Sequence, residues 1–351
     1  MTTSSTGFSA VPHLRTRALA DLAALVPAGS TVALINFPNH GNPGDPAIWL
    51  GTKSLLRALR IKVVYQAAWW NLDLAQLRAA LPPGGRVLLN GGGNFGDLYL
   101  GQQQQRERVL RELQDITLVQ MPESIFFTER ENLERVRDLI AAHGDFHLMV
   151  RETRSFDIAT RDLGVSPTLS PDHALALGPR KRRASPVSDI LWVSWMPGAK
   201  EYRAESAPPE DAPAITHLDW LDGAEKAGEG ASWRTRRAFA FNSQSFTEHN
   251  QGIALDASLR PKLARTYDPM ARRWVDRGFD ILGSARVVVT NKLHAHVFCA
   301  LTGQPHVVLD NSYGKVLGVV DAWTRDLPGV HIARDAEHAR DLANQLLADA
   351  T

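Results

Sequence analysis

The chain has 351 residues, of which 44% are hydrophobic and 22% charged, as in ordinary globular proteins, and this composition excludes intrinsic disorder. With 39 basic and 38 acidic residues the formal net charge is +1, so we expect no global attraction to nucleic acid or to a membrane. The single cysteine, Cys299, excludes an internal disulfide and a cysteine-built structural zinc site. We therefore expect neither a bound metal nor a nucleic-acid partner.

No apolar run approaches the roughly 20 residues that a membrane-spanning helix requires. The first 26 residues lack a basic-then-apolar secretory pattern, because Asp21 interrupts the only candidate apolar run. These features predict a cytoplasmic protein. Residues 14–26 allow two interpretations: an ordinary first helix of the fold, or an amphipathic helix that holds the protein peripherally at the inner face of the membrane.

Residues 1–180 alternate short apolar runs with amphipathic stretches. Buried strands are predicted at residues 32–36, 62–65, 86–90, 116–120 and 147–150. Apolar side chains at three-to-four spacing predict helices at residues 47–59, 72–81, 106–113 and 131–142. Alternation at this rate predicts an N-terminal α/β domain with a parallel sheet that is covered by helices on both faces.

A second α/β domain is predicted at residues 190–351, because 351 residues at roughly 150 per domain fit two domains. Residues 178–189 are basic and contain two prolines, and we place an interdomain linker at residues 181–189. A strand is predicted at 190–194, followed by a polar segment at 196–237 whose role the sequence leaves undefined. The alternation then resumes, with helices near 269–278, from 294, after 312 and at 336–348, and strands at 286–290 and 306–309.

Polar residues gather where the first predicted strand ends. In open parallel sheets, ligands bind beyond the carboxyl ends of the strands, where loops lead into helix N-termini. The loop at residues 36–45 holds Asn42 and Asp45 together with more polar side chains than a helix cap requires. It is therefore a candidate binding loop, although a capped strand-to-helix turn would explain part of the pattern.

Three consecutive glycines follow the third predicted strand. Gly91, Gly93 and Gly96 match the dinucleotide fingerprint, but the residues after Gly93 are a poor helix start, which argues against a nicotinamide or flavin site. Consecutive glycines still allow a close approach of backbone N–H groups to a phosphate or a sugar. Gly92, Gly93 and Asn94 are therefore candidate binding residues.

Four further strand ends carry candidate residues. Arg151 offers a planar fork for a carboxylate or phosphate, although a surface ion pair with Glu152 is the alternative. Histidine is the side chain type suited to proton exchange near neutral pH, so His294 is a candidate for that role, whereas His296 would lie on another face of the helix and is expected to be structural. Trp69-Trp70 could stack on a sugar ring or belong to the core. The remaining candidates at strand ends are Glu123, Ser124, Lys292, Asn311 and Lys315.

Together these residues resemble the polysaccharide pyruvyl transferases, which attach pyruvate from phosphoenolpyruvate to sugar hydroxyls, usually as a cyclic ketal. The resemblance spans about residues 36–323 and rests on seven motifs in order: Asn42-Pro43-Gly44-Asp45 with Ala47-Ile48, Gly91-Gly92-Gly93-Asn94, Pro122-Glu123-Ser124-Ile125, Arg151-Glu152 with Ser155, Pro171-Asp172-His173-Ala174, Leu293-His294, and Asp310-Asn311 with Tyr313-Gly314-Lys315. It implies two Rossmann-like domains in a glycosyltransferase-B-like arrangement, with the active site in the interdomain cleft. The family's Arg-Leu-His corner is Lys292-Leu293-His294 here, which keeps the charge and loses the bidentate fork.

The resemblance suggests a role for each candidate. His294 would bind the donor and act as the general acid, Lys292 and Arg151 would hold phosphate and carboxylate, and either Asp45 or Glu123 would be the base. Further substrate-binding candidates are Lys315, Asn42, Gly92, Gly93, Asn94, Ser124, Asp172 and Asn311. No cofactor is implied, because phosphoenolpyruvate is itself the donor substrate.

The acceptor would be a saccharide or a lipid-linked saccharide, bound on the N-terminal half. Two other functions compete with this hypothesis: a nucleotide-sugar-dependent glycosyltransferase of the same architecture, and a non-catalytic carbohydrate-binding homologue. The oligomeric state, the acceptor sugar and the stereochemistry of the ketal are not predicted by the sequence.

Overall fold

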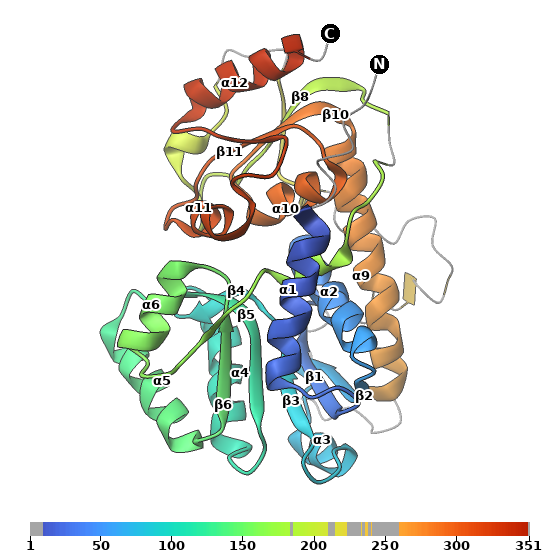
Figure 1. The fold of residues 1–351 in the computed structure, drawn as a ribbon, viewed down its shortest axis with the longest axis vertical. Coiled ribbons are helices and arrows are strands. Elements are labelled where there is room, and N and C mark those ends of the chain that lie inside the picture. Colours follow the sequence, from blue (N-terminus) through green and yellow to red (C-terminus); the bar gives the residue numbers. More distant parts are fainter. Residues whose placement is uncertain are drawn as a thin grey trace.

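The computed structural model describes residues 10–182, 185–209, 215–222, 233, 236, 237, 240 and 260–349. The protein has two parallel sheets, one in the lower half and one in the upper half of the view in Figure 1, and helices cover the faces of each sheet. The predicted α/β class with parallel sheets is therefore confirmed. Residues 183 and 184 of the predicted linker, and much of the polar segment at 196–237, lie outside the described residues.

The first sheet has seven strands, and every pairing within it is parallel. The strand order is β2-β1-β3-β5-β6-β7, with β4 paired to β5. The strands are β1 (Thr31–Phe37), β2 (Lys62–Ala68), β3 (Arg86–Leu89), β4 (Gly92–Gly96), β5 (Leu118–Phe126), β6 (Phe146–Val150) and β7 (Thr168–Leu169). The glycine segment, expected as a loop, is therefore itself a short strand.

Six α-helices come from the same part of the chain: α1 (Ala10–Leu25), α2 (Gly44–Ala58), α3 (Leu74–Ala80), α4 (Leu100–Glu112), α5 (Arg130–His143) and α6 (Thr153–Arg161). Short 3-10 turns form η2 (Trp69–Asn71) and η3 (His173–Leu177). Helix α1 buries Val11, Leu14, Ala18 and Leu22 in the core. These contacts favour an ordinary first helix, because the apolar face is not available to a membrane.

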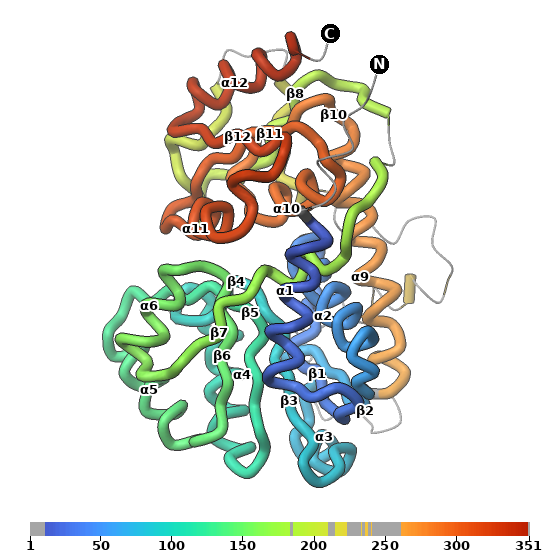
Figure 2. Tube along the Cα trace, viewed as in Figure 1, coloured from blue at the N-terminus to red at the C-terminus, as the bar shows by residue number. Residues whose placement is uncertain are grey.

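The second sheet has five parallel strands in the order β12-β11-β10-β8-β9. They are β8 (Ser188–Val193), β9 (Ile215–Leu218), β10 (Ala285–Thr290), β11 (His306–Val308) and β12 (Val330–Ile332). The helical elements are α9 (Arg260–Gly283), α10 (Leu293–Thr302), α11 (Lys315–Val319), the π-helical turn η6 (Val320–Thr324), α12 (Ala336–Asp349) and the 3-10 turn η4 (Ala204–Ser206). Figure 2 shows β11 and β12 side by side in the upper sheet.

Helix α9 joins the two halves. It follows the second sheet's β9 in sequence, yet it runs down beside α2 of the first half (Figure 1). Tyr267 of α9 stacks on Phe37 with ring centroids 4.1 Å apart, and Asp268 accepts a hydrogen bond from Trp49 Nε1 at 3.0 Å. One hydrophobic cluster therefore draws residues from both halves of the chain.

Each sheet has one position where the chain order reverses, between β1 and β3 in the first sheet and between β8 and β10 in the second. In open α/β sheets, ligands bind beyond the carboxyl ends of the strands at such a switch point. This topology directs attention to the loops that follow β1, β3, β8 and β10.

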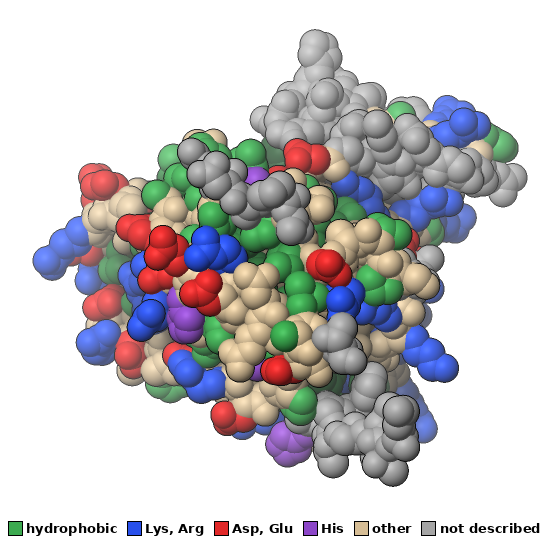
Figure 3. All heavy atoms as spheres, turned by 90° about the horizontal axis from the view of Figure 1, so that it is seen from above, with side chains coloured by type: hydrophobic (Ala, Val, Ile, Leu, Met, Phe, Trp, Pro, Cys, Tyr) green, Lys and Arg blue, Asp and Glu red, His purple; other side chains and the backbone are tan. Residues whose placement is uncertain are grey.

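Among the described residues, no helix combines the length and the apolar character needed to cross a bilayer. Seen from above, the described surface intersperses basic with acidic side chains (Figure 3). This mixture agrees with the balanced charge of the chain.

Candidate active site

A cavity of about 630 Å³ lies at the carboxyl ends of the strands, lined by residues from both sheets. The loops after β1, β8 and β10 contribute to it, near the two switch points, and the glycine segment contributes Gly93 and Asn94 of β4. Its lining is Asn39, His40, Gly41, Asn42, Asp45, Trp69, Gly93, Asn94, Tyr99, Gln102, Arg151, Trp195, Glu201, Trp220, Leu221, Lys292, Leu293, His294 and Lys315.

Eight of the thirteen candidate residues line this cavity: Asn42, Asp45, Gly93, Asn94, Arg151, Lys292, His294 and Lys315. The other five do not line it: Gly92, Glu123, Ser124, Asp172 and Asn311. Four of these five are bonded to lining residues. Ser124 accepts a hydrogen bond from Arg151 Nε at 2.8 Å, and Asn311 Oδ1 accepts one from the Lys315 backbone N–H at 3.0 Å.

Asp172 connects the two sheets. Its Oδ2 accepts a hydrogen bond from Arg151 Nη1 at 2.5 Å and lies 3.4 Å from His294 Nε2, while its Oδ1 accepts one from the Ala174 N–H. Burial alone would raise the pKa of this carboxyl, but His294, Arg151 and the Ala174 N–H hold the pKa below its usual value. Asp172 is therefore an ionised anchor, fully buried behind the cavity.

The two lysines of the cavity are also paired. Lys292 Nζ is 3.0 Å from Asp219 Oδ1 and 3.3 Å from the ring centre of Trp195, and burial lowers the pKa of this lysine to about 8 despite Asp219. Lys315 Nζ donates to Glu201 Oε2 at 2.6 Å. Burial alone would lower the pKa of Lys315, but Glu201 raises it above its usual value.

Glu201 joins several elements at the cavity. Its carboxylate also accepts hydrogen bonds from Tyr99 Oη at 3.1 Å and from Asn311 Nδ2 at 3.0 Å. Each of the three basic side chains of the cavity thus faces a carboxylate: Arg151 faces Asp172, Lys292 faces Asp219, and Lys315 faces Glu201. The cations converge as the sequence predicted, but the cluster is balanced in charge, so an anionic ligand must compete with these carboxylates.

Two glycines allow the charged groups to approach so closely. A Cβ at Gly93 would lie 2.9 Å from Arg151 Nη2 and 3.2 Å from Lys315 Nζ, so these two cations flank the same backbone position. A Cβ at Gly44 would lie 2.2 Å from Nδ1 of His294, closer than any such contact in real proteins. The imidazole therefore packs directly on the first residue of α2.

The two carboxylates proposed as bases lie in different surroundings. Asp45 lines the cavity with 28% of its side chain exposed, and its Oδ2 is 3.2 Å from His40 Nε2. Burial opposes its ionisation, yet the hydrogen bond and charge of His40, with His294 and Lys315, lower its pKa. Glu123 is fully buried, and burial raises its pKa to about 7 despite Arg106 and Arg151. Only Asp45 is placed to touch a ligand in the cavity.

Arg106 is a buried residue of the site that the sequence analysis did not select. This α4 side chain has no exposed surface and donates hydrogen bonds to Asn94 Oδ1 at 2.7 Å and to Glu123 Oε1 at 3.2 Å. Arg106 lies three and four residues before Val109 and Leu110, which places it on the apolar face of the predicted helix. This spacing could have indicated that Arg106 is buried.

Glu201, Trp195, Asp219 and Tyr99 were not selected either. The first three lie in or near the polar segment at 196–237, where no periodicity marks a buried position. Asn291 Oδ1 accepts a hydrogen bond from the Trp195 backbone N–H at 3.1 Å, which ties this segment to the corner after β10. Tertiary contacts of this kind leave no local trace in a sequence.

The sequence left open whether Trp69 and Trp70 stack on a sugar ring or belong to the core, and the structure places them in different surroundings. Trp69 lines the cavity, whereas Trp70 is 8% exposed and belongs to the hydrophobic core. Likewise, His296 is fully buried and bonded to His306 and Thr324, as expected for a structural histidine. Within the described part of the chain, no group of three or more His, Cys, Asp or Glu side chains could hold a metal ion.

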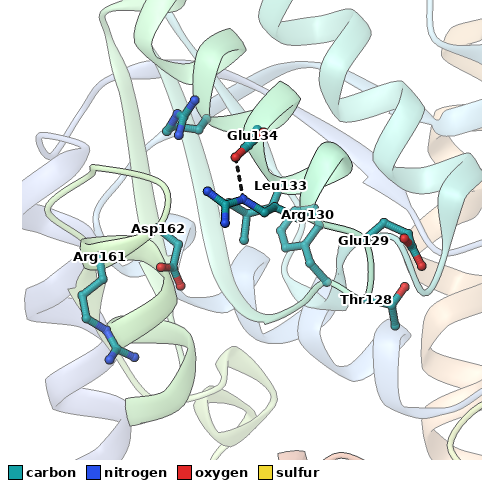
Figure 4. Close-up of a pocket in the computed structure, with 9 residues that line it drawn as sticks. Thr128, Glu129, Arg130, Leu133, Glu134, Arg161 and Asp162 are labelled. Carbon is teal, nitrogen blue, oxygen red and sulfur yellow. Dashed lines mark hydrogen bonds and ion pairs between the residues drawn. The ribbon is translucent and has the colours of Figure 1, made fainter.

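A second hollow, of about 450 Å³, lies beside α5 and contains none of the candidate residues (Figure 4). Arg130 Nε at its edge donates to Glu134 Oε1 at 2.7 Å, so these two opposite charges pair with each other (Figure 4). We assign no function to this hollow.

A sequence profile described as "Polysaccharide pyruvyl transferase" matches residues 42–313, which contain every residue named for the cavity except Asn39, His40, Gly41 and Lys315. The chain belongs to the polysaccharide pyruvyl transferase family. Its members are transferases, and the resemblance drawn from the seven motifs is confirmed.

Curated relatives extend along most of the chain. "Pyruvyl transferase 1" of Schizosaccharomyces pombe is 30% identical over 320 residues, covering 87% of this chain and 73% of the relative. "Putative pyruvyl transferase EpsO" of Bacillus subtilis is 27% identical over 332 residues, covering 92% and 95%. The crystal structure of an uncharacterized Klebsiella pneumoniae protein matches with a TM-score of 0.55 at 15% identity, covering 92% of this chain and 98% of that one, which shows a shared fold.

Proposed function

We propose that this transferase moves pyruvate from phosphoenolpyruvate to hydroxyls of a saccharide, forming a ketal, in the cavity between the two sheets. The observation that carries this proposal is the meeting of Arg151 and His294 on Asp172, with Lys292 and Lys315 in the same cavity. Phosphoenolpyruvate carries close to three negative charges at pH 7, since the second pKa of a phosphate monoester is about 6. Its recognition requires several converging cations.

The donor would lie among Arg151, Lys292 and Lys315. Arg151 donates from Nε to Ser124 and from Nη1 to Asp172, so its Nη2 would meet the donor's carboxylate or phosphate, and the lysines supply compact charges. Helices α2 and α10 both begin at the cavity, so their N-terminal N–H groups favour an anion there. Binding would draw the cations toward the donor from the carboxylates that they face here.

The chemistry involves three proton transfers, one to C3 of the donor and one from each of two sugar hydroxyls. A proton from His294 adds to C3 of the donor as a sugar oxygen bonds to C2, and a base takes the hydroxyl proton. The C2–O bond to phosphate then breaks, a second sugar hydroxyl bonds to C2, and the base takes its proton. Of the two protons that the hydroxyls release, one returns to His294 and the other protonates the departing phosphate. The products are the pyruvate ketal and inorganic phosphate. Of the two carboxylates suggested for the base, Asp45 lines the cavity and Glu123 is fully buried, so a role at this step favours Asp45 or a group bonded to it.

The acceptor saccharide would lie against the aromatic part of the lining. Trp69 and Trp195 provide apolar faces, and Asn39, Asn42 and Gln102 provide amides for sugar hydroxyls. We propose that the two sheets form two Rossmann-like domains, 1–180 and 190–351, in a glycosyltransferase-B-like arrangement. We also propose a cytoplasmic location, on the sequence pattern alone. The family assignment argues against the nucleotide-sugar alternative.

The test is incubation of the full chain with phosphoenolpyruvate and a panel of galactosides, mannosides and glucosides. The expected result is acceptor-dependent release of phosphate and an acceptor mass increased by one pyruvate ketal. His294→Ala should lower the rate by about 10²–10⁴-fold. In a thermal-shift screen, a ligand at 100 times its Kd adds about 2.7 kcal/mol of stability. Stabilisation by nucleotide sugars and not by phosphoenolpyruvate would refute the proposal.

A further inference from the structure

His40 is a second histidine in the cavity, and the roles given above leave it unassigned. It lies in the loop between β1 and α2, five residues before Asp45, and both side chains line the cavity. The side chain of His40 is 38% exposed and that of Asp45 is 28% exposed, so a ligand can reach both. By contrast, the Glu123 carboxyl is fully buried and bonded to Arg106 and to the Asn94 N–H.

The geometry of this pair fixes the orientation of the imidazole. His40 Nε2 is 3.2 Å from Asp45 Oδ2, a distance that suits a hydrogen bond donated by the ring to the carboxylate. An imidazole that carries its proton on Nε2 presents Nδ1 as an acceptor. A carboxylate that orients an imidazole, which in turn accepts a hydroxyl proton, is the arrangement by which many enzymes activate a hydroxyl group.

Asp45 by itself is poorly suited to accept that proton. His294 on α10 and Lys315 on α11 are close enough to act on its charge, together with His40. The hydrogen bond from His40 and the positive charges of the other two groups stabilise the ionised carboxylate and so reduce its basicity. An imidazole is better matched to proton transfer near neutral pH, because catalysis is most efficient when the pKa of the base lies near the working pH.

We infer that His40 is the catalytic base that activates the sugar hydroxyl, and that Asp45 is the positioning residue that orients it. This inference rests on the proposed pyruvyl transfer. Nδ1 of His40 takes the proton of the attacking hydroxyl as that oxygen bonds to C2. The electron pair of the C2–C3 double bond moves to C3, which takes its proton from His294. His40 then releases its proton to solvent through its exposed face and is ready for the second hydroxyl.

The chain contains a matched control pair. His147 Nε2 is 3.0 Å from Asp145 Oδ1, and these side chains are 43% and 53% exposed. His147 lies near the amino end of β6, at the edge of the sheet opposite the cavity. His147→Gln therefore removes a similar exposed histidine–aspartate pair with no contact to the site.

Transfer to the panel of galactosides, mannosides and glucosides is compared for the wild type, His40→Gln and His147→Gln. His40→Gln should lower kcat by about 10²–10⁴-fold and leave the affinity for phosphoenolpyruvate within about threefold, whereas His147→Gln should match the wild type. Added imidazole should partly restore the rate of His40→Ala. Wild-type kcat in His40→Gln, or a loss confined to donor affinity, would overturn the inference.

A second measurement is independent of the acceptor. In ¹⁵N NMR of the labelled full chain, the ring signals of His40, assigned by their absence in His40→Gln, should show the proton on Nε2. Asp45→Asn should weaken that preference. A proton on Nδ1 in the wild type would overturn the inference even if no sugar of the panel is a substrate. A wild type that does not bind phosphoenolpyruvate would instead refute the proposed function.

Discussion

Arg151 and His294 come from different sheets, and both lie against one oxygen of Asp172. Arg151 follows β6 and donates to Oδ2 at 2.5 Å, and His294 lies in the first turn of α10 with Nε2 at 3.4 Å from the same atom. A single buried carboxylate therefore holds a cation from the first half of the chain and an imidazole from the second. Asp172 thus brings these two candidate residues together from opposite sides of the cavity.

Replacing Asp172 with asparagine should destabilise the protein strongly. The substitution leaves the guanidinium of Arg151 buried without its principal counter-ion, and breaking a buried pair in this way costs roughly 3–5 kcal/mol. Urea denaturation at pH 7 measures the loss. The control is Asp341→Asn, which removes an exposed partner of Arg340 and should leave stability unchanged. A loss for Asp172→Asn as small as that of the control would show that Asp172 is no anchor.

Gly44→Ala should impair catalysis while the fold is retained. The added Cβ would lie 2.2 Å from His294 Nδ1, so the imidazole must leave its present position beside Asp172. Displacing a catalytic group by about 1 Å can cost roughly 10²-fold in rate. Steady-state kinetics and circular dichroism test both parts of the prediction. Gly101→Ala, also in the first turn of a helix but with open space around the new Cβ, should behave as the wild type.

The strands with continuous apolar runs were predictable from the sequence, whereas the polar second part of β5 was not. The run at 32–36 predicted β1, which spans Thr31–Phe37. The apolar run at 116–120 predicted a strand that should end at Gln120, but β5 continues through Glu123 and Ser124 to Phe126. Those polar residues are buried inside the strand because Arg106 and Arg151 hydrogen-bond to them. Such a strand has no hydrophobic signature, since its partners lie far away in the sequence.

The candidate site was predictable where it rests on strand ends. Asp45, Arg151, Lys292 and His294 follow buried runs, and the sheet brings them together. Glu201 was not predictable, because it lies in a segment without periodicity and acquires its role only by meeting Lys315 and Tyr99. The ion pairs of Arg151, Lys292 and Lys315 with carboxylates were likewise not predictable from the sequence, because they form only in the folded cavity.

The free energy of unfolding should vary with pH differently in Glu123→Gln and in the wild type. Burial raises the pKa of Glu123 from its usual 4.5 to about 7, so between these values the folded protein holds a proton that the unfolded chain has released. Wild-type stability therefore falls as the pH rises through this window. Glutamine has no such proton, so the variant should gain roughly 3 kcal/mol relative to the wild type between pH 4.5 and about pH 8. Urea denaturation at the two pH values tests this, and parallel stability curves would contradict it.

Trp69→Ala should weaken acceptor binding, whereas Trp70→Ala should lower stability, although the two residues are adjacent. Trp69 lines the cavity, and losing about 1 kcal/mol of stacking would raise the acceptor KM roughly fivefold with the donor KM unchanged. Trp70 is 8% exposed in the core, so its truncation should cost roughly 3–5 kcal/mol of stability. Kinetics on the best acceptor of the panel and urea denaturation separate the two effects. An unchanged acceptor KM in Trp69→Ala would show that this ring does not stack on the sugar, because the substitution removes the whole indole.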